Sequence, residues 1–232
     1  MAVAVVTGAS RGLGRALARA LAAKGWSLVL DARGAEALGE VAVELSALGV
    51  AVVALPGDVT DAAHRAELVA AAEGLGGLEL LVNNASVLGA EPLVTLAEQP
   101  LDGFRAALEV NTVAPLALAQ AALPLLRASG GALLNISSDA AVEAYETWGG
   151  YGASKAALDH WSAVLAAEEP ALRVWSVDPG DMRTAMYAAA VPTDDDSGRP
   201  LPEQAAVPAL LALIGGTRGS GRYTVTELGG ER

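Results

Sequence analysis

The sequence predicts a doubly wound α/β domain, in which a seven-stranded parallel sheet is covered by helices on both faces. Short β-branched or leucine-rich runs alternate with amphipathic helical stretches from the first residues almost to the last. Strands and helices that alternate in this way form βαβ units, which place neighbouring strands parallel and cover both faces of the sheet. The 232 residues contain no internal repeat, so a single domain over residues 1–232 is expected.

The first part of the chain predicts three strand–helix pairs. In chain order they are Val3–Thr7, Gly12–Lys24, Trp26–Asp31, Glu36–Leu48, Val50–Leu55 and a helix capped by Thr60 that runs through Glu73. Gly25 and Gly49 follow the first two helices and are typical helix stops.

The second part predicts four more strands with longer helices between them. In chain order the elements are Leu78–Asn83, a helix over Leu101–Arg127, Gly131–Ser137, Tyr151–Glu169, Leu172–Asp178, Gln204–Ile214 and Arg222–Leu228. Pro115 and Pro124 predict kinks or early boundaries in the longest helix. Val191–Pro202 is rich in Asp, Pro and Gly, and we expect it to belong to a substrate lid over residues 181–202.

Composition excludes several classes of protein. The net charge of −12 disfavours a nucleic-acid partner, whose phosphates require Lys and Arg. Arg, Gln, Gly or Pro interrupts every apolar run before the ~18 residues of a membrane span, so no membrane partner is expected. The absence of cysteine excludes disulfides and thiolate chemistry, and two histidines leave too few ligands for a histidine metal site, so no metal is expected. No signal peptide is recognisable at the start, which predicts a cytoplasmic protein.

A glycine-rich turn joins the first strand to the first helix. Residues 7–14 read Thr-Gly-Ala-Ser-Arg-Gly-Leu-Gly. Glycines let the backbone turn tightly and approach a pyrophosphate, whose charge then faces the helix N-terminus. The simpler alternative is a turn without a ligand, but the strand–turn–helix context favours a Rossmann-type dinucleotide site.

The pattern Thr-Gly-x-x-x-Gly-x-Gly resembles that of the short-chain dehydrogenase/reductase family. Three further segments match this family in order: Asn83–Ala85 after a strand, Tyr151 with Lys155 on a helix, and Pro179–Gly180 with Thr184 after a strand. The resemblance covers residues 1–228 and implies hydride transfer with a nicotinamide cofactor. It also implies a set of cofactor-binding residues: Gly8, Ser10, Arg11, Gly12, Leu13, Gly14, Arg33, Asp58, Val59, Asn83, Ala85, Tyr151, Lys155, Pro179, Gly180 and Thr184.

Two positions depart from the family's usual residues. Ser86 stands where glycine is usual and would crowd the nicotinamide ribose, and Asp178 stands where asparagine is common. Asp58 has a second interpretation, as a turn or helix-capping residue. For Asn83 and Asn84 we expect side-chain amides that tie down neighbouring backbone.

The segment after the second strand predicts NADP(H) as the preferred cofactor. An acidic side chain there would bind the ribose 2′-hydroxyl of NAD, whereas arginine accommodates the 2′-phosphate of NADP. The resemblance aligns the acid with Ala32 and the base with Arg33, and Arg11 is a second base. A slip of one residue would place Asp31 at the discriminating position and favour NAD(H), which stays the alternative.

The resemblance implies four catalytic residues: Asn111, Ser138, Tyr151 and Lys155. Tyr151 and Lys155 are four residues apart, so a helix places them on one face. The ammonium group and oxidised nicotinamide would lower the tyrosine pKa, which makes Tyr151 a general acid/base. Ser138 would hydrogen-bond the reacting oxygen, and Asn111 would support a proton relay to the lysine. A hydrolase centred on Ser138 is excluded, since Gly-x-Ser-x-Gly is absent.

The leading functional hypothesis is an NADP(H)-dependent carbonyl reductase or alcohol dehydrogenase with a small-molecule substrate. A 3-oxoacyl-carrier-protein reductase and a non-catalytic dinucleotide-sensing protein are the alternatives. The acidic run Asp194–Asp196 beside the lid argues against an acidic carrier protein. Apolar residues on the helices 101–127 and 151–169 exceed what one sheet face needs, which predicts a homodimer or homotetramer.

Overall fold

The computed structural model describes residues 1–229 and contains one seven-stranded sheet in the order β3-β2-β1-β4-β5-β6-β7. In chain order the strands are β1 (Val3–Val6), β2 (Ser27–Ala32), β3 (Val52–Pro56), β4 (Leu80–Asn83), β5 (Ala132–Ile136), β6 (Arg173–Asp178) and β7 (Gly221–Thr224). All neighbouring strands are parallel, which confirms the predicted fold class. Residues 230–232 of the predicted domain lie outside the described residues.

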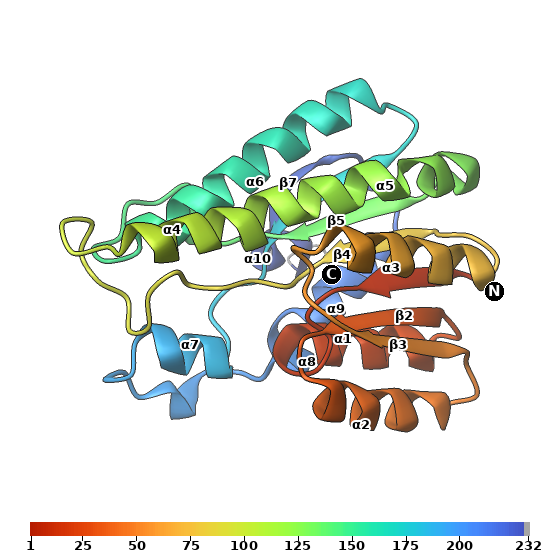
Figure 1. Cartoon of the computed structure of the whole chain (residues 1–232), viewed down its shortest axis with the longest axis horizontal. Coiled ribbons are helices and arrows are strands. Elements are labelled where there is room, and N and C mark those ends of the chain that lie inside the picture. The colour runs from red at the N-terminus through yellow and green to blue at the C-terminus, as the bar shows by residue number, and fades with distance from the viewer. Residues whose placement is uncertain (230–232) are drawn as a thin grey trace.

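Helices cover both faces of this sheet (Figure 1). One layer contains α1 (Gly12–Ala23), α2 (Ala35–Ser46), α8 (Pro202–Ala205) and α9 (Val207–Gly215). The opposite layer contains α3 (Ala62–Gly74), α5 (Ala114–Ser129) and α6 (Gly149–Glu168). Alternate strand residues enter the two cores: Leu28 and Leu30 face the first layer, and Val29 faces the second.

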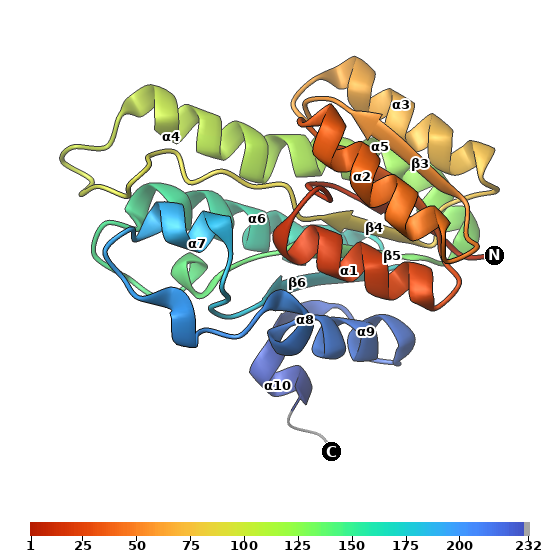
Figure 2. The ribbon, with the colours of Figure 1, turned by 90° about the horizontal axis from the view of Figure 1, so that it is seen from below.

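Two short helices lie away from these layers. α4 (Leu101–Leu108) continues the line of α5, and α7 (Ala185–Ala190) lies at the same end of the molecule (Figure 2). Because β1 and β4 are neighbours in the sheet and their chains continue to opposite sides, a crevice opens at their carboxyl ends. In open α/β sheets this switch point is where ligands bind.

Several element boundaries differ from the sequence predictions, among them those of α3, β7 and α8. Asp61 rather than Thr60 caps α3, because the Thr60 hydroxyl donates to Asp58 while the Asp61 carboxylate accepts from the Ala63 amide. The last strand ends at Thr224, so the second half of the predicted strand Arg222–Leu228 is wrong. The predicted helix Gln204–Ile214 is divided into α8 and α9.

The early end of β7 has a clear local cause. The Glu227 carboxylate accepts a hydrogen bond from the Thr224 amide at 2.7 Å, and the Thr224 hydroxyl accepts one from the Glu227 amide at 3.2 Å. This reciprocal pair is a capping box, and it starts α10 (Val225–Gly229). The sequence Thr-x-x-Glu carried that signal.

The long helical stretch Leu101–Ser129 contains a π-helical turn, η1 (Glu109–Val113), between α4 and α5. Pro115 lies at the start of α5, where a boundary was predicted, whereas Pro124 lies inside α5 without ending it. By length and apolar composition this is the one helix of the described chain that could cross a membrane. Leu118, Ala122 and Leu126 are buried in the core against the sheet, which accounts for part of that composition.

Candidate active site

One cavity of about 880 Å³ opens at the carboxyl ends of the central strands. Its walls come from the glycine turn, the segments after β2, β3 and β4, the end of β5, the first turns of α6 and residues 178–187. Of the residues predicted to bind cofactor or to react, all but Gly14, Asn83 and Asn111 line it.

The glycine turn is shaped by close backbone approaches. Gly8 and Gly12 have φ values of +64° and +55°, a region that favours glycine. A Cβ on Gly14 would lie 2.4 Å from the Gly8 carbonyl oxygen and 2.5 Å from Asn84 Nδ2. Around Gly12 the nearest atom to such a Cβ would be Thr184 Cγ2, at 3.8 Å. The turn is therefore closely packed against neighbouring backbone at Gly14 and open toward the cavity at Gly12.

The segment after β4 fastens this turn. The Asn84 and Ala85 amides both donate to Thr7 Oγ1 at 3.0 Å, and the Asn84 side chain donates to the Thr7 carbonyl at 2.8 Å. Asn84 thus does what its position after the strand predicted. Asn83 does not reach the cavity: it is buried and donates to Asn135 on β5 at 2.8 Å. Its side-chain amide ties β4 to β5 rather than bordering the cavity, and its contact with a cofactor stays a prediction.

Two arginines stand exposed at the outer end of the cavity. Arg11 and Arg33 both line it, and within residues 1–229 neither guanidinium takes part in a hydrogen bond or an ion pair. Neighbouring Asp58 accepts hydrogen bonds from the Thr60 amide and hydroxyl, which lower the pKa of its carboxyl group, and Arg33 lowers it further. Asp58 therefore forms the turn that was its alternative interpretation while also lining the cavity.

Asp31, the residue on which an NAD preference would depend, is engaged elsewhere. Its carboxylate lies 2.7 Å from His64 Nε2 on α3, and both side chains are buried. Burial raises the pKa of Asp31, while the contact with His64 opposes that rise. His64 also packs against Gly57, where a Cβ would meet the imidazole at 2.3 Å. The sequence analysis did not identify His64, because no local pattern links it to a residue of β2.

Tyr151 and Lys155 lie one turn apart near the start of α6 and are both buried. Lys155 Nζ is 5.6 Å from the centre of the Tyr151 ring and donates to the Ile136 carbonyl at 2.8 Å. Gly152 allows α6 to lie close to the loop after β5, since a Cβ on this residue would lie 2.3 Å from the Ala140 carbonyl oxygen. A glycine-rich first turn therefore brings α6 against the loop that follows β5.

Burial controls the protonation of both groups. It raises the pKa of Tyr151 to about 12, although a hydrogen bond with Ser86 lowers it in part. It lowers the pKa of Lys155 to about 8, and the charge of Asp159 opposes that change. From the protein's own groups, the tyrosine pKa thus moves in the direction opposite to the one predicted. The reason is that loss of solvent around the phenolate outweighs the hydrogen bond with Ser86, and the charges of Asp139 and Asp178 add to the rise.

Ser138 and Ser137 differ in hydrogen bonding and in exposure, because neighbouring side chains at the end of a strand point in opposite directions. The Ser138 hydroxyl donates to the Asp139 carboxylate at 3.0 Å and accepts from the Ala140 amide at 3.1 Å, at the start of a short 3₁₀ turn, η2 (Asp139–Ala141). Ser137 is buried, and its hydroxyl has no partner among the described residues. Both residues border the cavity, and Ser138 is the more exposed of the two.

Asn111 lies in the π-helical turn η1 and is buried behind the cavity wall. Its amide donates to the Val87 carbonyl at 2.8 Å and to Ser154 Oγ at 2.9 Å, and its oxygen accepts from Ser86 Oγ at 3.1 Å. Ser86, which replaces a usual glycine, therefore connects Asn111 with Tyr151.

Segment 178–202 closes the remaining side of the cavity. Asp178 is buried and accepts from the Gly180 amide at 2.9 Å, and Thr184 caps α7 by accepting from the Tyr187 amide at 3.2 Å. Arg199 joins this segment to itself through Asp181, Asp194 and the Tyr187 hydroxyl. Near Tyr151 the wall is apolar and comes from separate elements: Leu88, Trp148, Met186 and Ala190.

The model of the family described as short chain dehydrogenase matches residues 2–195, so the chain belongs to the short-chain dehydrogenases. An uncharacterised oxidoreductase of Staphylococcus aureus (strain USA300) is 37% identical over 196 residues, which are 83% of each chain. A short-chain dehydrogenase structure from Pseudomonas syringae superposes with a TM-score of 0.89 at 33% identity, over 97% of this chain and 94% of the other.

A second solved structure names a cofactor derivative. The alcohol dehydrogenase of the archaeon Thermococcus sibiricus, complexed with 5-hydroxy-NADP, is similar with a TM-score of 0.87 and 30% identity, over 97% of this chain and 95% of the other. Family membership makes the chain a nicotinamide-dependent oxidoreductase.

Proposed function

We propose that this protein is an NADP(H)-dependent carbonyl reductase or alcohol dehydrogenase that uses Tyr151 as its general acid/base. One observation carries the proposal: Ser138, Tyr151 and Lys155 line the same cavity as the glycine turn. A proton donor, a hydrogen-bond donor for the reacting oxygen and a dinucleotide cradle are thus within one enclosed space. That combination is what hydride transfer to a carbonyl requires.

The residues present fit a phosphorylated dinucleotide. Gly8, Gly12 and Gly14 leave the N-terminus of α1 open to a pyrophosphate. Arg11 and Arg33, which have no ion pair within the described chain, are free to take a 2′-phosphate. Asp31 is held by His64, which removes the acidic competitor for that site and supports NADP(H) over NAD(H). The NADP derivative in the archaeal relative agrees with this choice.

A bound reduced nicotinamide supplies the hydride. Tyr151, whose pKa of about 12 keeps it protonated at neutral pH, donates the proton to the carbonyl oxygen. The Ser138 hydroxyl exchanges its bond to Asp139 for one to that oxygen and stabilises the charge that develops there. Lys155 stabilises the phenolate left on Tyr151. Asn111 holds the cavity wall at Val87 and supports the proton relay to Lys155.

The cavity walls favour a small, largely apolar carbonyl substrate. Leu88, Trp148 and Met186 surround Tyr151, and Asp139 and Asp178 add negative charge beside it. A 3-oxoacyl-carrier-protein reductase would need a basic landing surface, whereas residues 181–202 carry Asp181 and the run Asp194–Asp196. A purely sensing protein would not need the Tyr151–Lys155 pair.

Consumption of NADPH with a panel of ketones and aldehydes tests the proposal. We expect turnover with the unaltered protein and a loss of about 1000-fold in Tyr151→Phe, while NADPH still binds. Phenylalanine keeps the ring's packing against Trp148 and removes only the proton donor. Turnover of Tyr151→Phe close to that of the unaltered protein would contradict the assignment.

We also propose that the active form is a homodimer or homotetramer. The outer faces of η1, directly before α5, and of α6 carry Val113 and Val164, with 48% and 44% of their surfaces exposed. Trp161 is a poor probe of this face because it packs partly against the core. Val164→Glu should give a smaller particle than the unaltered protein by light scattering, and a monomeric mass for the unaltered protein would refute the proposal.

A further inference from the structure

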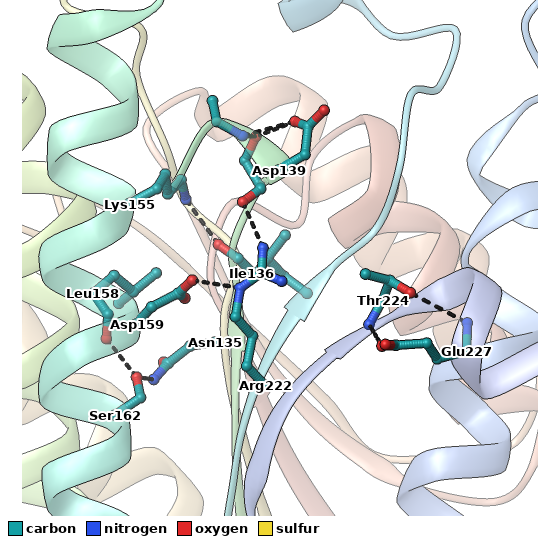
Figure 3. A network of polar contacts seen from close by, with 12 residues as sticks. Asn135, Ile136, Asp139, Lys155, Leu158, Asp159, Ser162, Arg222, Thr224 and Glu227 are labelled. Atoms are coloured by element: carbon teal, nitrogen blue, oxygen red, sulfur yellow. Dashed lines mark hydrogen bonds and ion pairs between the residues drawn. The ribbon is translucent and has the colours of Figure 1, made fainter. Parts of the chain in front are cut away.

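Arg222 connects the edge strand β7 to two parts of the candidate active site (Figure 3). Its Nε donates to Asp159 Oδ2 on α6 at 2.9 Å, and its Nη2 donates to the Ser138 carbonyl oxygen at 3.0 Å. The sequence analysis assigned no role to either Arg222 or Asp159. Neither residue lines the cavity, so any effect on the reaction must pass through the residues they contact.

The loop that carries Ser138 is held at both ends by cations. The Lys155 ammonium, from α6, donates to the Ile136 carbonyl, and the Arg222 guanidinium, from β7, donates to the Ser138 carbonyl two residues later. Charged donors form stronger hydrogen bonds than neutral ones. The carbonyls on both sides of Ser137 are therefore fixed, and with them the direction in which the Ser138 side chain leaves the backbone.

Asp159 links the two cations. It lies one helical turn after Lys155, on the same face of α6, and only 12% of its side chain is exposed. One carboxylate oxygen accepts from Arg222, while the other has no hydrogen-bond partner among the described residues. Arg222 therefore neutralises the negative charge of this carboxylate only in part, and the carboxylate still acts to raise the pKa of Lys155.

We propose that Arg222 and Asp159 are positioning residues of the active site: their ion pair fixes the Ser138 loop against α6 and balances the charge around Lys155. This inference rests on the proposed function for its kinetic consequences. The two residues oppose each other at Lys155. The Asp159 carboxylate favours the ammonium form, and the Arg222 guanidinium reduces that preference by neutralising Asp159.

Other charged groups near Lys155 and Arg222 do not replace this pair. Tyr151 on α6 is uncharged at neutral pH, because its pKa is about 12. The negative charges of Asp139, after β5, and Asp178, at the end of β6, act to raise the pKa of Tyr151. The positive charge of Arg222 acts to lower the pKa values of Asp178 and Glu227. Of all these groups, Asp159 alone has a resolved effect on Lys155.

The protonation of Lys155 can be followed directly, because the chain contains only two lysines, Lys24 and Lys155. NMR of protein labelled with isotopic lysine gives two side-chain signals, and Lys24→Arg assigns them. We expect Asp159→Asn to lower the titration midpoint of Lys155 and Arg222→Met to raise it, each by about half a pH unit or more. The double variant, which leaves no unpaired charge, should lie between the two.

Opposite shifts of the midpoint are the signature of the proposed balance. A structural role alone would lower the melting temperature of both variants and leave the Lys155 midpoint unchanged or shift it in one direction, which would overturn the proposal. If Arg222→Met or Asp159→Asn does not fold, the double variant compared with the unaltered protein still tests the pair. Identical midpoints and identical activity in those two proteins would refute it.

A kinetic arm separates the two roles of Arg222. Arg222→Lys keeps the charge beside Asp159, but a single ammonium cannot hold both Asp159 and the Ser138 carbonyl as the forked guanidinium does. We expect kcat to fall about tenfold with an unchanged Lys155 midpoint, as for a slightly misplaced catalytic group. An unchanged kcat would refute the positioning of Ser138. If the unaltered protein reduced no carbonyl compound, the proposed function would fail, while the NMR result would still judge the ion pair.

Discussion

The two halves of the candidate site are built from different kinds of interaction. The cofactor turn, residues 7–14 with 83–85, is held by neutral hydrogen bonds between the backbone, Thr7 and Asn84. The catalytic half, residues 136–159, is held by charged groups with little solvent around them. Neutral contacts do not titrate, whereas the buried ammonium group of Lys155 does. We therefore expect the first half to be sensitive to volume and the second to pH and charge.

The largest effect on cofactor affinity should come from adding volume beneath the cofactor turn. Gly14→Val would place a Cβ about where the Gly8 carbonyl and the Asn84 amide already lie, so the turn must open. We expect NADPH affinity, measured by fluorescence titration, to fall more than about 100-fold, because the backbone can no longer face the pyrophosphate.

A matched control uses a glycine that has space around it. Gly39 lies in the middle of α2, and a Cβ there would have no heavy atom within 4 Å. Gly39→Ala should leave NADPH binding unchanged and raise the melting temperature slightly, since alanine is the better helix former. If Gly14→Val bound NADPH as tightly as this control, the turn would not be the cofactor cradle.

Most of the fold and the cofactor turn could be predicted because their signals are local. Alternating apolar runs indicated the strands, and Gly8, Gly12 and Gly14 all lie within the short segment 7–14. The strand boundary at Thr224 was missed although its capping box is equally local. There the β-branched run through Val225 favoured a strand, and the cap prevailed.

The side-chain pairs that complete the site could not be predicted in this way. Asp31 meets His64 across 33 positions of sequence, and Arg222 meets Asp159 across 63. Such pairs depend on how β2 faces α3 and how β7 faces α6, which no short pattern encodes. The direction of the Tyr151 pKa could not be predicted for a related reason: burial is a property of the whole fold, and it raises this pKa more than the Ser86 hydrogen bond lowers it.

The charged half should show its character in the pH dependence of stability. Folding lowers the pKa of Lys155 from 10.5 to about 8, so between these values the unfolded chain holds a proton that the folded chain has released. The free energy of unfolding should therefore rise with pH across this window, by about 3 kcal/mol in total for this one group. Tyr151 acts only above pH 10, where its raised pKa makes stability fall again.

Lys155→Met isolates that contribution. Methionine keeps the unbranched shape and cannot titrate, so the rise in stability between pH 8 and 10 should disappear from urea unfolding curves of the variant. Lys24→Met provides the matched control, because Lys24 is exposed at the end of α1. A variant and a control that both kept the rise would show that burial of Lys155 does not destabilise its charged form.

The smallest effect should appear at the exposed rim of the cofactor half, where charge enters an otherwise neutral region. Arg33 lies beside Asp58 with no ion pair in the described chain, so its attraction for a 2′-phosphate is weakened by solvent and salt. Arg33→Ala should weaken NADPH binding about tenfold, near 1.4 kcal/mol, with little change for NADH. Arg105→Ala, which removes an exposed arginine paired only with Asp102, serves as the control.

Raising the salt concentration should reduce the difference in affinity between the two cofactors in the unaltered protein and less so in Arg33→Ala. Equal affinities for NADPH and NADH in the unaltered protein would contradict the assignment of Arg33 to the phosphate.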